Sequence, residues 1–280
     1  MKKAVFILLG QSNATGHGIP MAPEDRIEAP LKNVFGLHRD HNQSFEIQKL
    51  TWSGYTSEGM NLAETQDHTY SVANCLAGKW QKAIDGGAAL PDLYIIQIAI
   101  GAQGVREGYM WHPDREPKLI PGKLGKVDIS LHPFCMHIFS LLKESLGEYE
   151  IIGLHWRGGE NDAYDQPEQV SVTVKPVYER LLEDWSRVLN NPPIVLHRIV
   201  AHERYTDRDP SGRQLQSMHI INSIFDDMAK QYPNVSVFDV RCCPYYMPGV
   251  RGNGIFKSDM VHFTPEVNAW VAENILEAQL

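Results

Sequence analysis

The sequence predicts an α/β protein, with a three-layer α/β/α, flavodoxin-like domain built on a parallel sheet of about five strands. Two observations predict this class. Short apolar runs alternate with longer helical patterns along the chain, which is typical of right-handed strand–helix–strand units. Hydrophobic residues make up 43% of the 280 residues, enough for a sizeable core. No internal repeat, low-complexity tract or linker divides the chain, so we expect one domain over residues 1–280.

Five apolar runs predict strands that are buried on both faces. They span residues 4–9, 93–100, 151–156, 194–200 and 235–240. The first run has the apolar character of a secretory leader, but it is short and no small-residue cleavage site follows it. We therefore expect a buried strand at the start of a leaderless protein.

Between these runs, apolar side chains that recur every third or fourth residue predict helices. Such patterns begin at Val72, Val174 and Leu215. A last helix is expected after Thr264, because threonine is a favoured N-cap and Pro265 suits the first helical position. Strands and helices in this alternation give a sheet covered on both faces.

Two long stretches, residues 15–61 and 102–131, fit neither pattern. Structureless loops of that length are uncommon inside a compact domain and often have a function. Each stretch follows the carboxyl end of a predicted strand, the edge at which open α/β sheets bind ligands. We expect both to form long loops over this active edge.

Charge and cysteine content exclude several classes of protein. The 26 basic and 34 acidic side chains give a net charge of −8, and no basic cluster suits a nucleic acid. Four cysteines without metal-site spacing predict neither a disulfide framework nor a metal site, and they suit a reducing compartment. No apolar run approaches the roughly 20 residues needed to cross a bilayer. We expect a cytoplasmic protein without a metal, membrane or nucleic-acid partner.

Residues that could carry chemistry follow the predicted strands. Ser12 lies in a turn after the first strand, Gly101 follows the second, and residues 158–162 (GGEND) follow the third. Asp259 and His262 precede the last helix. Because the carboxyl ends of parallel strands share one edge, these groups should meet there. They are the groups that acyl transfer needs: Ser12 becomes nucleophilic when His262 removes its proton, and a carboxylate orients the histidine.

The four segments resemble, in order, the sequence blocks of the SGNH hydrolases, a superfamily of esterases and lipases with a flavodoxin-like sheet. The nearer likeness is to the branch of sialic-acid-type O-acetylesterases and family 6 acetylxylan esterases, whose serine block reads Gly-Gln-Ser-Asn, as residues 10–13 do. The blocks Gly-x-Asn-Asp and Asp-x-x-His match residues 159–162 and 259–262. The resemblance implies a single SGNH-type domain. It also implies a carboxylic ester hydrolase, similar to acetylxylan esterases, that removes O-acetyl or other short acyl groups from a carbohydrate.

The resemblance further implies roles for individual residues. Ser12 would be the nucleophile and its own N–H one oxyanion donor, with a second donor at Gly101. His262 would be the general base. We expect Asp259 to orient His262, because the three-residue spacing lets a loop carboxylate reach its own histidine. Glu160 is the alternative acid, as in some relatives.

This chain departs from the nearer branch at two places. Relatives often have a second glycine where this chain has Ala102, and they tend to read Trp-x-Gln-Gly-Glu where residues 156–160 are WRGGE. Gly158 thus replaces a glutamine that could donate to the oxyanion. Asn161 is expected to take that role, with an Asx turn as the alternative. We expect Arg157 to be a surface charge, with a substrate-binding cation as the alternative.

Substrate contacts are expected from three side chains in these turns and loops, Gln11, Gln103 and Trp111. Aromatic rings near a hydrolytic serine can stack on sugars, but loop aromatics also pin loops, so both interpretations of Trp111 stay open. The expected partner is a small-molecule or oligosaccharide acetyl ester. Acyl transfer through serine needs no cofactor, and the sequence does not specify an oligomeric state.

Two other functions fit parts of the sequence. Residues 10–18 could form the loop of a phospho-ligand-binding α/β domain, but neither Gly-x-x-x-x-Gly-Lys-Ser/Thr nor Gly-x-Gly-x-x-Gly occurs there. The missing glutamine also allows a catalytically inactive, carbohydrate-binding relative. The joint presence of Ser12, Asp259 and His262 favours the active esterase.

Overall fold

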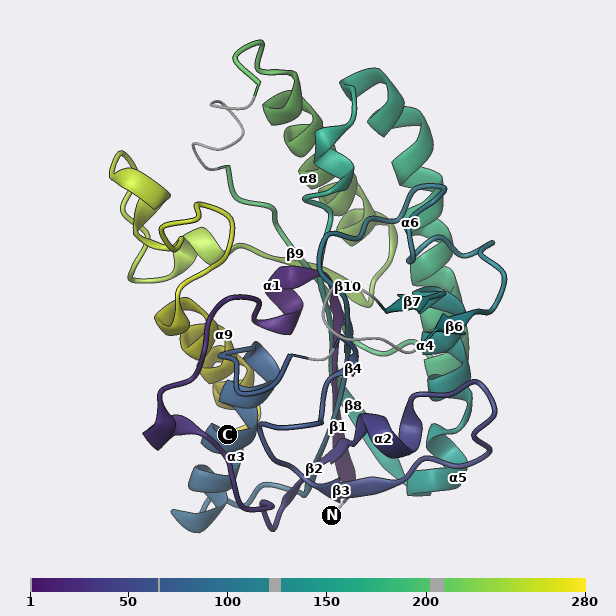
Figure 1. Cartoon of the computed structure of the whole chain (residues 1–280), viewed down its shortest axis with the longest axis vertical. Helices are drawn as coiled ribbons and strands as arrows, with labels where there is room; N and C mark the ends of the chain where they lie inside the picture. Colours follow the sequence, from purple (N-terminus) through teal and green to yellow (C-terminus); the bar gives the residue numbers. More distant parts are fainter. Residues whose placement is uncertain (1, 65, 121–126, 202–208) are drawn as a thin grey trace.

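The structure of the chain, a computed structural model, describes residues 2–64, 66–120, 127–201 and 209–280. A central sheet lies between two layers of helices (Figure 1). In the described residues this sheet has eight strands: β1 (Lys3–Gly10), β2 (Val34–Leu37), β3 (Trp52–Gly54), β4 (Leu62–Ala63), β5 (Leu93–Ala99), β8 (Tyr149–Arg157), β9 (Ile194–His197) and β10 (Val235–Phe238). Five of them, β1, β5, β8, β9 and β10, are the strands that the apolar runs predict.

The strand order confirms the predicted fold class. The path across the sheet is β10-β9-β8-β1-β5-β2-β3, and β4 pairs with the carboxyl end of β5, beyond β2. Neighbouring strands are parallel except for β2 and β3. If only the five predicted strands are numbered along the chain, their order is 2-1-3-4-5, that of flavodoxin-like sheets.

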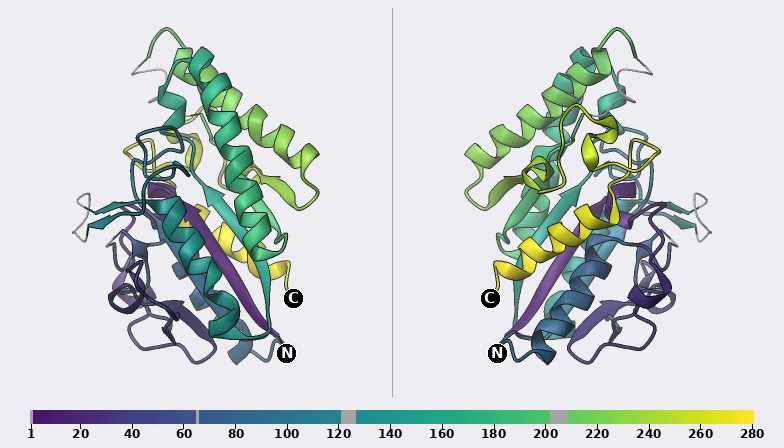
Figure 2. Two further views of the ribbon diagram at one scale, coloured as in Figure 1. Left: turned by 90° about the vertical axis from the view of Figure 1, so that its right-hand side faces the viewer. Right: turned by 90° about the vertical axis from the view of Figure 1, so that its left-hand side faces the viewer.

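Helices cover both faces of the sheet, as Figures 1 and 2 show. On one face lie α3 (Val72–Asp85) and α9 (Pro265–Glu277). On the other face lie α4 (Leu131–Ser140), α6 (Pro167–Leu189) and α8 (Arg213–Gln231). The predicted helices are thus confirmed, with Pro265 as the first residue of the last one. None of the described helices is long and apolar enough to cross a membrane.

The central strand β1 shows why its sequence is apolar at every position. Val5, Ile7 and Leu9 belong to the core beneath α4, α6 and α8. The alternate residues Phe6 and Leu8 belong to the core beneath α3 and α9. Successive side chains of a strand point to opposite faces, so a strand covered on both sides needs apolar residues throughout.

The two stretches predicted as long loops contain short elements instead. Residues 15–61 include β2, α2 (Arg39–Asn42) and β3, which extend the edge of the sheet. Residues 102–131 include the hairpin of β6 (Leu119–Ile120) and β7 (Asp128–Ile129), while 121–126 lie outside the described residues. Strands of two to four residues have no detectable period, which is why the sequence did not reveal them. The remaining short helices are α1 (Ser12–Thr15), α5 (Leu142–Leu146), η1 (Pro23–Asp25), η2 (Asp162–Tyr164), η3 (Val240–Cys242) and η4 (Arg251–Gly254).

The carboxyl ends of the three central strands are level with one another. The last residue of β1, Gly10, pairs with Ala99 of β5 and with Arg157 of β8. A Cβ on Gly10 would lie only 2.0 Å from the carbonyl oxygen of Arg157, so only glycine fits this position. The segments that follow β1, β5 and β8 therefore leave the sheet side by side.

Candidate active site

Ser12 is the first residue of α1, two residues after β1 ends. The Gln11 N–H donates to the Arg157 carbonyl at 3.0 Å, which ties this turn to β8. The Thr15 hydroxyl donates to the carbonyl of Ser12 at 2.8 Å and closes the short helix. Among the described residues, the Ser12 hydroxyl has no hydrogen-bond partner, so it is available to a base or a substrate.

Asp259 and His262 form the predicted pair in the loop before α9. The Oδ2 atom of Asp259 lies 2.8 Å from Nδ1 of His262. The other carboxylate oxygen accepts the backbone N–H groups of Val261 and His262, each at 3.0 Å. Burial works to raise the pKa of Asp259, but these hydrogen bonds from His262 and Val261 outweigh it and lower the pKa to about 2. The carboxylate therefore stays ionised and fixes the ring, with Nε2 unoccupied within the described part of the chain.

Asn13 joins the serine turn to this loop. Its amide nitrogen donates to the carbonyl oxygen of Val261 at 3.2 Å, and its carbonyl oxygen accepts the N–H of Phe263 at 3.3 Å. The same amide nitrogen donates to Glu160 at 2.9 Å. No role was predicted for Asn13, although its place beside Ser12 in the matching block was a signal.

Glu160 holds the serine turn and does not contact His262. One carboxylate oxygen accepts the side-chain amide of Gln11 at 2.5 Å, and the other accepts that of Asn13. Gln11, a predicted substrate contact, is thus engaged through its nitrogen. Its Oε1 is buried without a partner in the described structure. The geometry favours Asp259 over Glu160 as the acid that orients His262.

The expectation for Arg157 was wrong, because this side chain is buried beneath the site. Its guanidinium donates to the carbonyl of Asn13 at 3.1 Å and to the side chain of Asn268 at 2.8 Å. The guanidinium also lies over the ring of Phe263, 5.0 Å from its centroid. Burial lowers the pKa of Arg157 to about 10, and the nearby Glu160 carboxylate opposes that shift.

The three expected oxyanion donors differ in their availability. The Ser12 N–H and the side-chain amide of Asn161 make no hydrogen bond among the described residues. An Asx turn, the alternative interpretation of Asn161, is therefore not formed. The Gly101 N–H, in contrast, donates to Oε2 of Glu64 at 2.5 Å. Glu64 was missed by the sequence analysis because no motif surrounds it.

Three other residues, one from the third block and two predicted substrate contacts, make contacts inside the protein. Asp162 is fully buried and accepts the N–H of Val105 at 3.1 and 3.2 Å, linking the segments after β5 and β8. Gln103, a predicted substrate contact, accepts the N–H of Met110 at 3.1 Å. Trp111, another one, is 0% exposed and donates to the carbonyl of Gly10 at 3.0 Å. Its ring packs in the core and is not open to stacking on a sugar. The prediction of a substrate contact at Trp111 was therefore wrong.

A second histidine, His17, lies beside the pair. The ring centroids of His17 and His262 are 4.9 Å apart, and the other side of His17 contacts the amide of Gln66. Burial first, and the neighbouring His262 second, lower the pKa of His17. A neutral imidazole therefore borders the base, a feature that the sequence analysis also missed.

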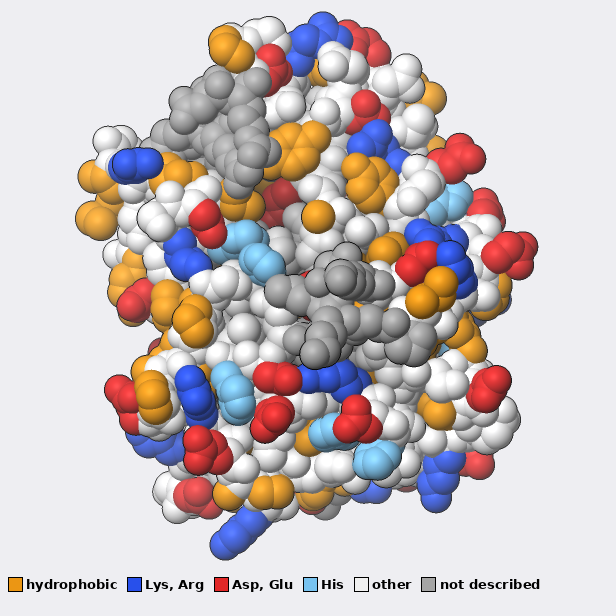
Figure 3. Space-filling view, viewed as in Figure 1, with side chains coloured by type: hydrophobic (Ala, Val, Ile, Leu, Met, Phe, Trp, Pro, Cys, Tyr) orange, Lys and Arg blue, Asp and Glu red, His pale blue; other side chains and the backbone are white. Residues whose placement is uncertain are grey.

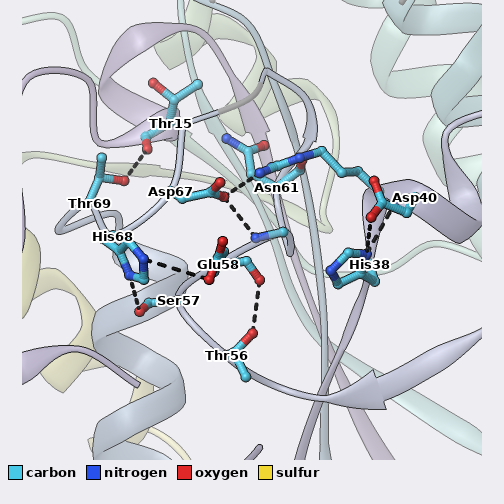
Figure 4. Close-up of polar contacts among 12 residues, drawn as sticks. Thr15, His38, Asp40, Thr56, Ser57, Glu58, Asn61, Asp67, His68 and Thr69 are labelled. Carbon is cyan, nitrogen blue, oxygen red and sulfur yellow. Dashed lines mark hydrogen bonds and ion pairs between the residues drawn. The ribbon is translucent and has the colours of Figure 1, made fainter. Parts of the chain in front are cut away.

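A polar cavity of about 450 Å³ opens beside the segment that follows β4. Figure 4 shows polar contacts of several residues in its wall. On the molecular surface, acidic and histidine side chains gather over this end of the sheet, near β2 and β3 (Figure 3). Asp67 is held in the wall by the side chain of Arg39 and by the N–H of Gly59 at 2.8 Å. The lining residues are Ile27, Glu28, His38, Arg39, Asp40, Thr56, Glu58, Gly59, Asp67 and His68.

The cavity wall is linked to α1 in space, because His68 precedes Thr69, whose hydroxyl donates to the carbonyl of Thr15 at 2.9 Å. Glu64 reaches the Gly101 N–H. Asp67 follows Glu64 by three residues, so the Cα atoms of Glu64 and Asp67 are at most about 11 Å apart. Within the described residues, no group of three or more His, Cys, Asp or Glu side chains is arranged to hold a metal ion. The lining of the cavity offers hydrogen-bonding groups.

Comparisons with known proteins give a structural likeness only. No protein-family model matches the chain, and no curated protein matches its sequence. The solved structure of NanS superposes with a TM-score of 0.61 at 15% identity, covering 99% of this chain and 97% of NanS. A protein from Arabidopsis thaliana gives 0.58 at 16% identity, with 100% and 98% covered.

A carbohydrate acetylesterase from Xanthomonas citri gives a TM-score of 0.53 at 10% identity. The match covers 97% of this chain but 54% of that longer protein. Together these likenesses confirm the predicted fold, that of the SGNH hydrolases, over nearly the whole chain.

Proposed function

We propose that the protein is a serine esterase of the SGNH type that removes O-acetyl groups from a carbohydrate through an acyl-enzyme intermediate. The observation that carries the proposal is the 2.8 Å hydrogen bond between Asp259 and His262, in a loop that Asn13 ties to the serine turn. The fold shared with the carbohydrate acetylesterase of Xanthomonas citri supports the same class of reaction.

In the first half of the proposed reaction, the Ser12 hydroxyl oxygen attacks the ester carbonyl carbon. The hydroxyl proton passes to Nε2 of His262, and the Asp259 carboxylate stabilises the imidazolium that forms. The carbonyl oxygen becomes an oxyanion, which accepts hydrogen bonds from the Ser12 N–H and the Asn161 amide. When this intermediate collapses, the bond from the acyl carbon to the sugar oxygen breaks, and His262 gives its proton to that oxygen.

In the second half, a water molecule attacks the acyl-serine. His262 takes one proton from this water and returns it to the Ser12 oxygen as the acyl–serine bond breaks. Acetic acid leaves and ionises in solution. The ring of His262 must therefore keep one orientation through both halves, which the two carboxylate oxygens of Asp259 ensure.

The polar cavity supports a hydroxylated alcohol as the leaving group. Its lining offers the carboxylate of Glu58, the rings of His38 and His68, and the hydroxyl of Thr56. A sugar hydroxyl both donates and accepts hydrogen bonds, so a saccharide can pair with all of these groups. A lipid chain could not pair with these groups and would cover them at a free-energy cost. An acetylated saccharide is thus the best-supported substrate class.

The phospho-ligand alternative is disfavoured by charge. Two carboxylates border the serine turn, Glu64 beside Gly101 and Glu160 beside Gln11. A phosphate bound to this turn would lie next to two like charges, and the repulsion between them is strong at short range.

Labelling and hydrolysis test the proposal. A fluorophosphonate should modify the wild-type protein on the peptide that contains Ser12. Wild type should hydrolyse p-nitrophenyl acetate and acetylated xylo-oligosaccharides, whereas Ser12→Ala should lose about 10⁴-fold or more in kcat. The melting temperature of Ser12→Ala should stay close to that of wild type. A label on another serine, or full activity of Ser12→Ala, would refute the proposed mechanism.

A further inference from the structure

The carboxylate of Glu64 accepts a hydrogen bond from a backbone N–H that the proposed reaction could use. Its Oε2 atom lies 2.5 Å from the backbone nitrogen of Gly101. A Cβ built on Gly101 would lie 3.4 Å from this oxygen and 3.7 Å from Cβ of Ser12. The two side chains are therefore on the same side of Gly101. The carboxylate oxygen stands where the carbonyl oxygen of an ester attacked by Ser12 would meet the Gly101 N–H.

The Glu64 side chain is held there in a buried position. The residue is 3% exposed, and in the described part of the chain no Lys, Arg or His side chain forms an ion pair with it. A buried carboxylate that forms no ion pair is unfavourable, and such exceptions concentrate at functional sites. The contact depends on β4, because Ala63 pairs with Ala99 of β5 and brings the next residue beside Gly101.

We propose that Glu64 is a specificity-determining residue that occupies the oxyanion site until a bound substrate displaces it. This inference rests on the proposed esterase function. A carboxylate and an oxyanion cannot share the Gly101 N–H, because two negative charges at that distance repel strongly. The ester carbonyl has to replace Oε2 before the reaction gains this third donor.

The energy for the displacement comes from the rest of the substrate. Asp67 and His68, in the cavity wall, belong to the same chain segment as Glu64. A saccharide that fills the cavity contacts this segment, whereas a small aryl acetate does not. Binding energy from a remote part of a substrate can assemble a catalytic site in this way. Glu64 then makes turnover depend on the sugar.

Two variants separate the charge from the hydrogen bond. Glu64→Gln keeps an acceptor oxygen and removes the charge, and Glu64→Ala removes both. For Glu64→Ala we expect kcat/KM for p-nitrophenyl acetate to rise about tenfold, and that for an acetylated xylo-oligosaccharide by about threefold or less. The kcat/KM values of Glu64→Gln should lie between those of wild type and Glu64→Ala. The control Glu107→Gln, at an exposed glutamate of the loop after β5, should change neither value.

Anion binding gives a second readout that does not need turnover. Acetate should inhibit Glu64→Ala at a concentration about tenfold lower than wild type, because the competing carboxylate is gone. In protein labelled with [¹⁵N]glycine, the Gly101 amide proton should move upfield in Glu64→Ala, and added acetate should shift it back. In wild type, acetate should leave this signal unchanged.

The outcomes distinguish this inference from the proposed function. If kcat/KM for the aryl ester is unchanged or lower in both variants, Glu64 does not compete for the oxyanion site and the inference is overturned. If wild type hydrolyses no ester, the proposed function fails. The response of the Gly101 amide to acetate would then still decide whether Glu64 occupies an anion site.

Discussion

The two sides of the Ser12 turn hold their carboxylates in different ways. On the β8 side, Glu160 accepts two side-chain amides, and Asp259 accepts the ring and backbone of its own loop. On the β4 side, Glu64 accepts the N–H of Gly101. The first two carboxylates bind groups that only need to be positioned, whereas the third binds a donor that the reaction could use. The β8 side is thus a fixed frame, and the β4 side is where we propose that a substrate displaces Glu64.

Among the variants that compare the two sides of the Ser12 turn, the largest expected effect tests the fixed frame. Asp259→Asn should lower kcat by about 10³–10⁴-fold, because the amide can no longer hold His262 in the required tautomer or stabilise the imidazolium. KM should change little. Steady-state kinetics with p-nitrophenyl acetate measure both values.

The matched control for that variant is Glu160→Gln. Glu160 contacts Gln11 and Asn13 but not His262, so its substitution should disturb the serine turn and cost less kcat than Asp259→Asn. A greater loss in Glu160→Gln would show that the orienting acid has been assigned to the wrong carboxylate.

The second prediction concerns Asn161, the proposed side-chain oxyanion donor in the segment after β8. Asn161→Ala should lower kcat by about 10²–10³-fold with little change in KM, since the ground-state ester carries no full negative charge. Asn161→Asp, which replaces the donor amide by an acceptor, should be at least as impaired. Near-normal kcat in Asn161→Ala would show that backbone donors alone form the oxyanion site.

The same contrast explains what the sequence could and could not predict. Continuous apolar runs identified the five central strands, and the geometry of parallel sheets then placed Ser12, Asn161, Asp259 and His262 at one edge. Glu64 could not be predicted, because its contact depends on β4, a two-residue strand without a periodic pattern.

Burial was a further limit on prediction. Trp111 and Arg157 have residue types that suit a binding surface, yet both side chains lie inside the protein. Trp111 packs edge to face against Trp156, and Arg157 lies beneath Asn13. Both positions depend on how segments distant in sequence pack together, which residue type and spacing do not specify.

The pH dependence of stability tests whether a histidine of β8 is buried in its neutral form. His155 and His197 are buried in neighbouring strands, with Nδ1 of His155 2.9 Å from Nε2 of His197. Burial, and then the charge of Arg157, lower the pKa of His155 to about 3. The unfolded chain takes up this proton near pH 6.5, so between that pH and about 3 the unfolded state binds more protons and stability falls as pH falls.

The expected change for His155 alone is about 2 kcal/mol in the free energy of unfolding between pH 7 and pH 5. Urea unfolding at both pH values measures it. His155→Asn keeps a nitrogen or oxygen near His197 but cannot take up the proton, so its stability should fall by about 2 kcal/mol less than that of wild type. Equal pH dependence in the two proteins would contradict the buried, neutral state of His155.

The cavity on the β4 side gives a smaller effect, which should appear only with a sugar substrate. The Glu58 carboxylate lines the cavity and has an exposed side chain. Glu58→Gln should raise KM for an acetylated xylo-oligosaccharide about fivefold, the loss of a charge-assisted hydrogen bond to a sugar hydroxyl. Its kcat/KM for p-nitrophenyl acetate should not change. The control Glu46→Gln, an exposed glutamate outside the cavity, should behave as wild type with both substrates.

The smallest expected effect concerns the backbone of Ala102, which follows Gly101, the donor of the N–H that Glu64 accepts. Ala102 has a φ of 58°, a left-handed conformation that is unfavourable for alanine by about 1–2 kcal/mol. Glycine, which relatives often have here, adopts it freely, but glycine also gains entropy in the unfolded chain. Ala102→Gly should therefore gain less than 1–2 kcal/mol, and the melting temperature should rise by about 2 °C. The exposed Ala89 is not in this conformation, so Ala89→Gly should lower the melting temperature instead. If both variants lose stability, the left-handed backbone at Ala102 holds no strain that glycine relieves.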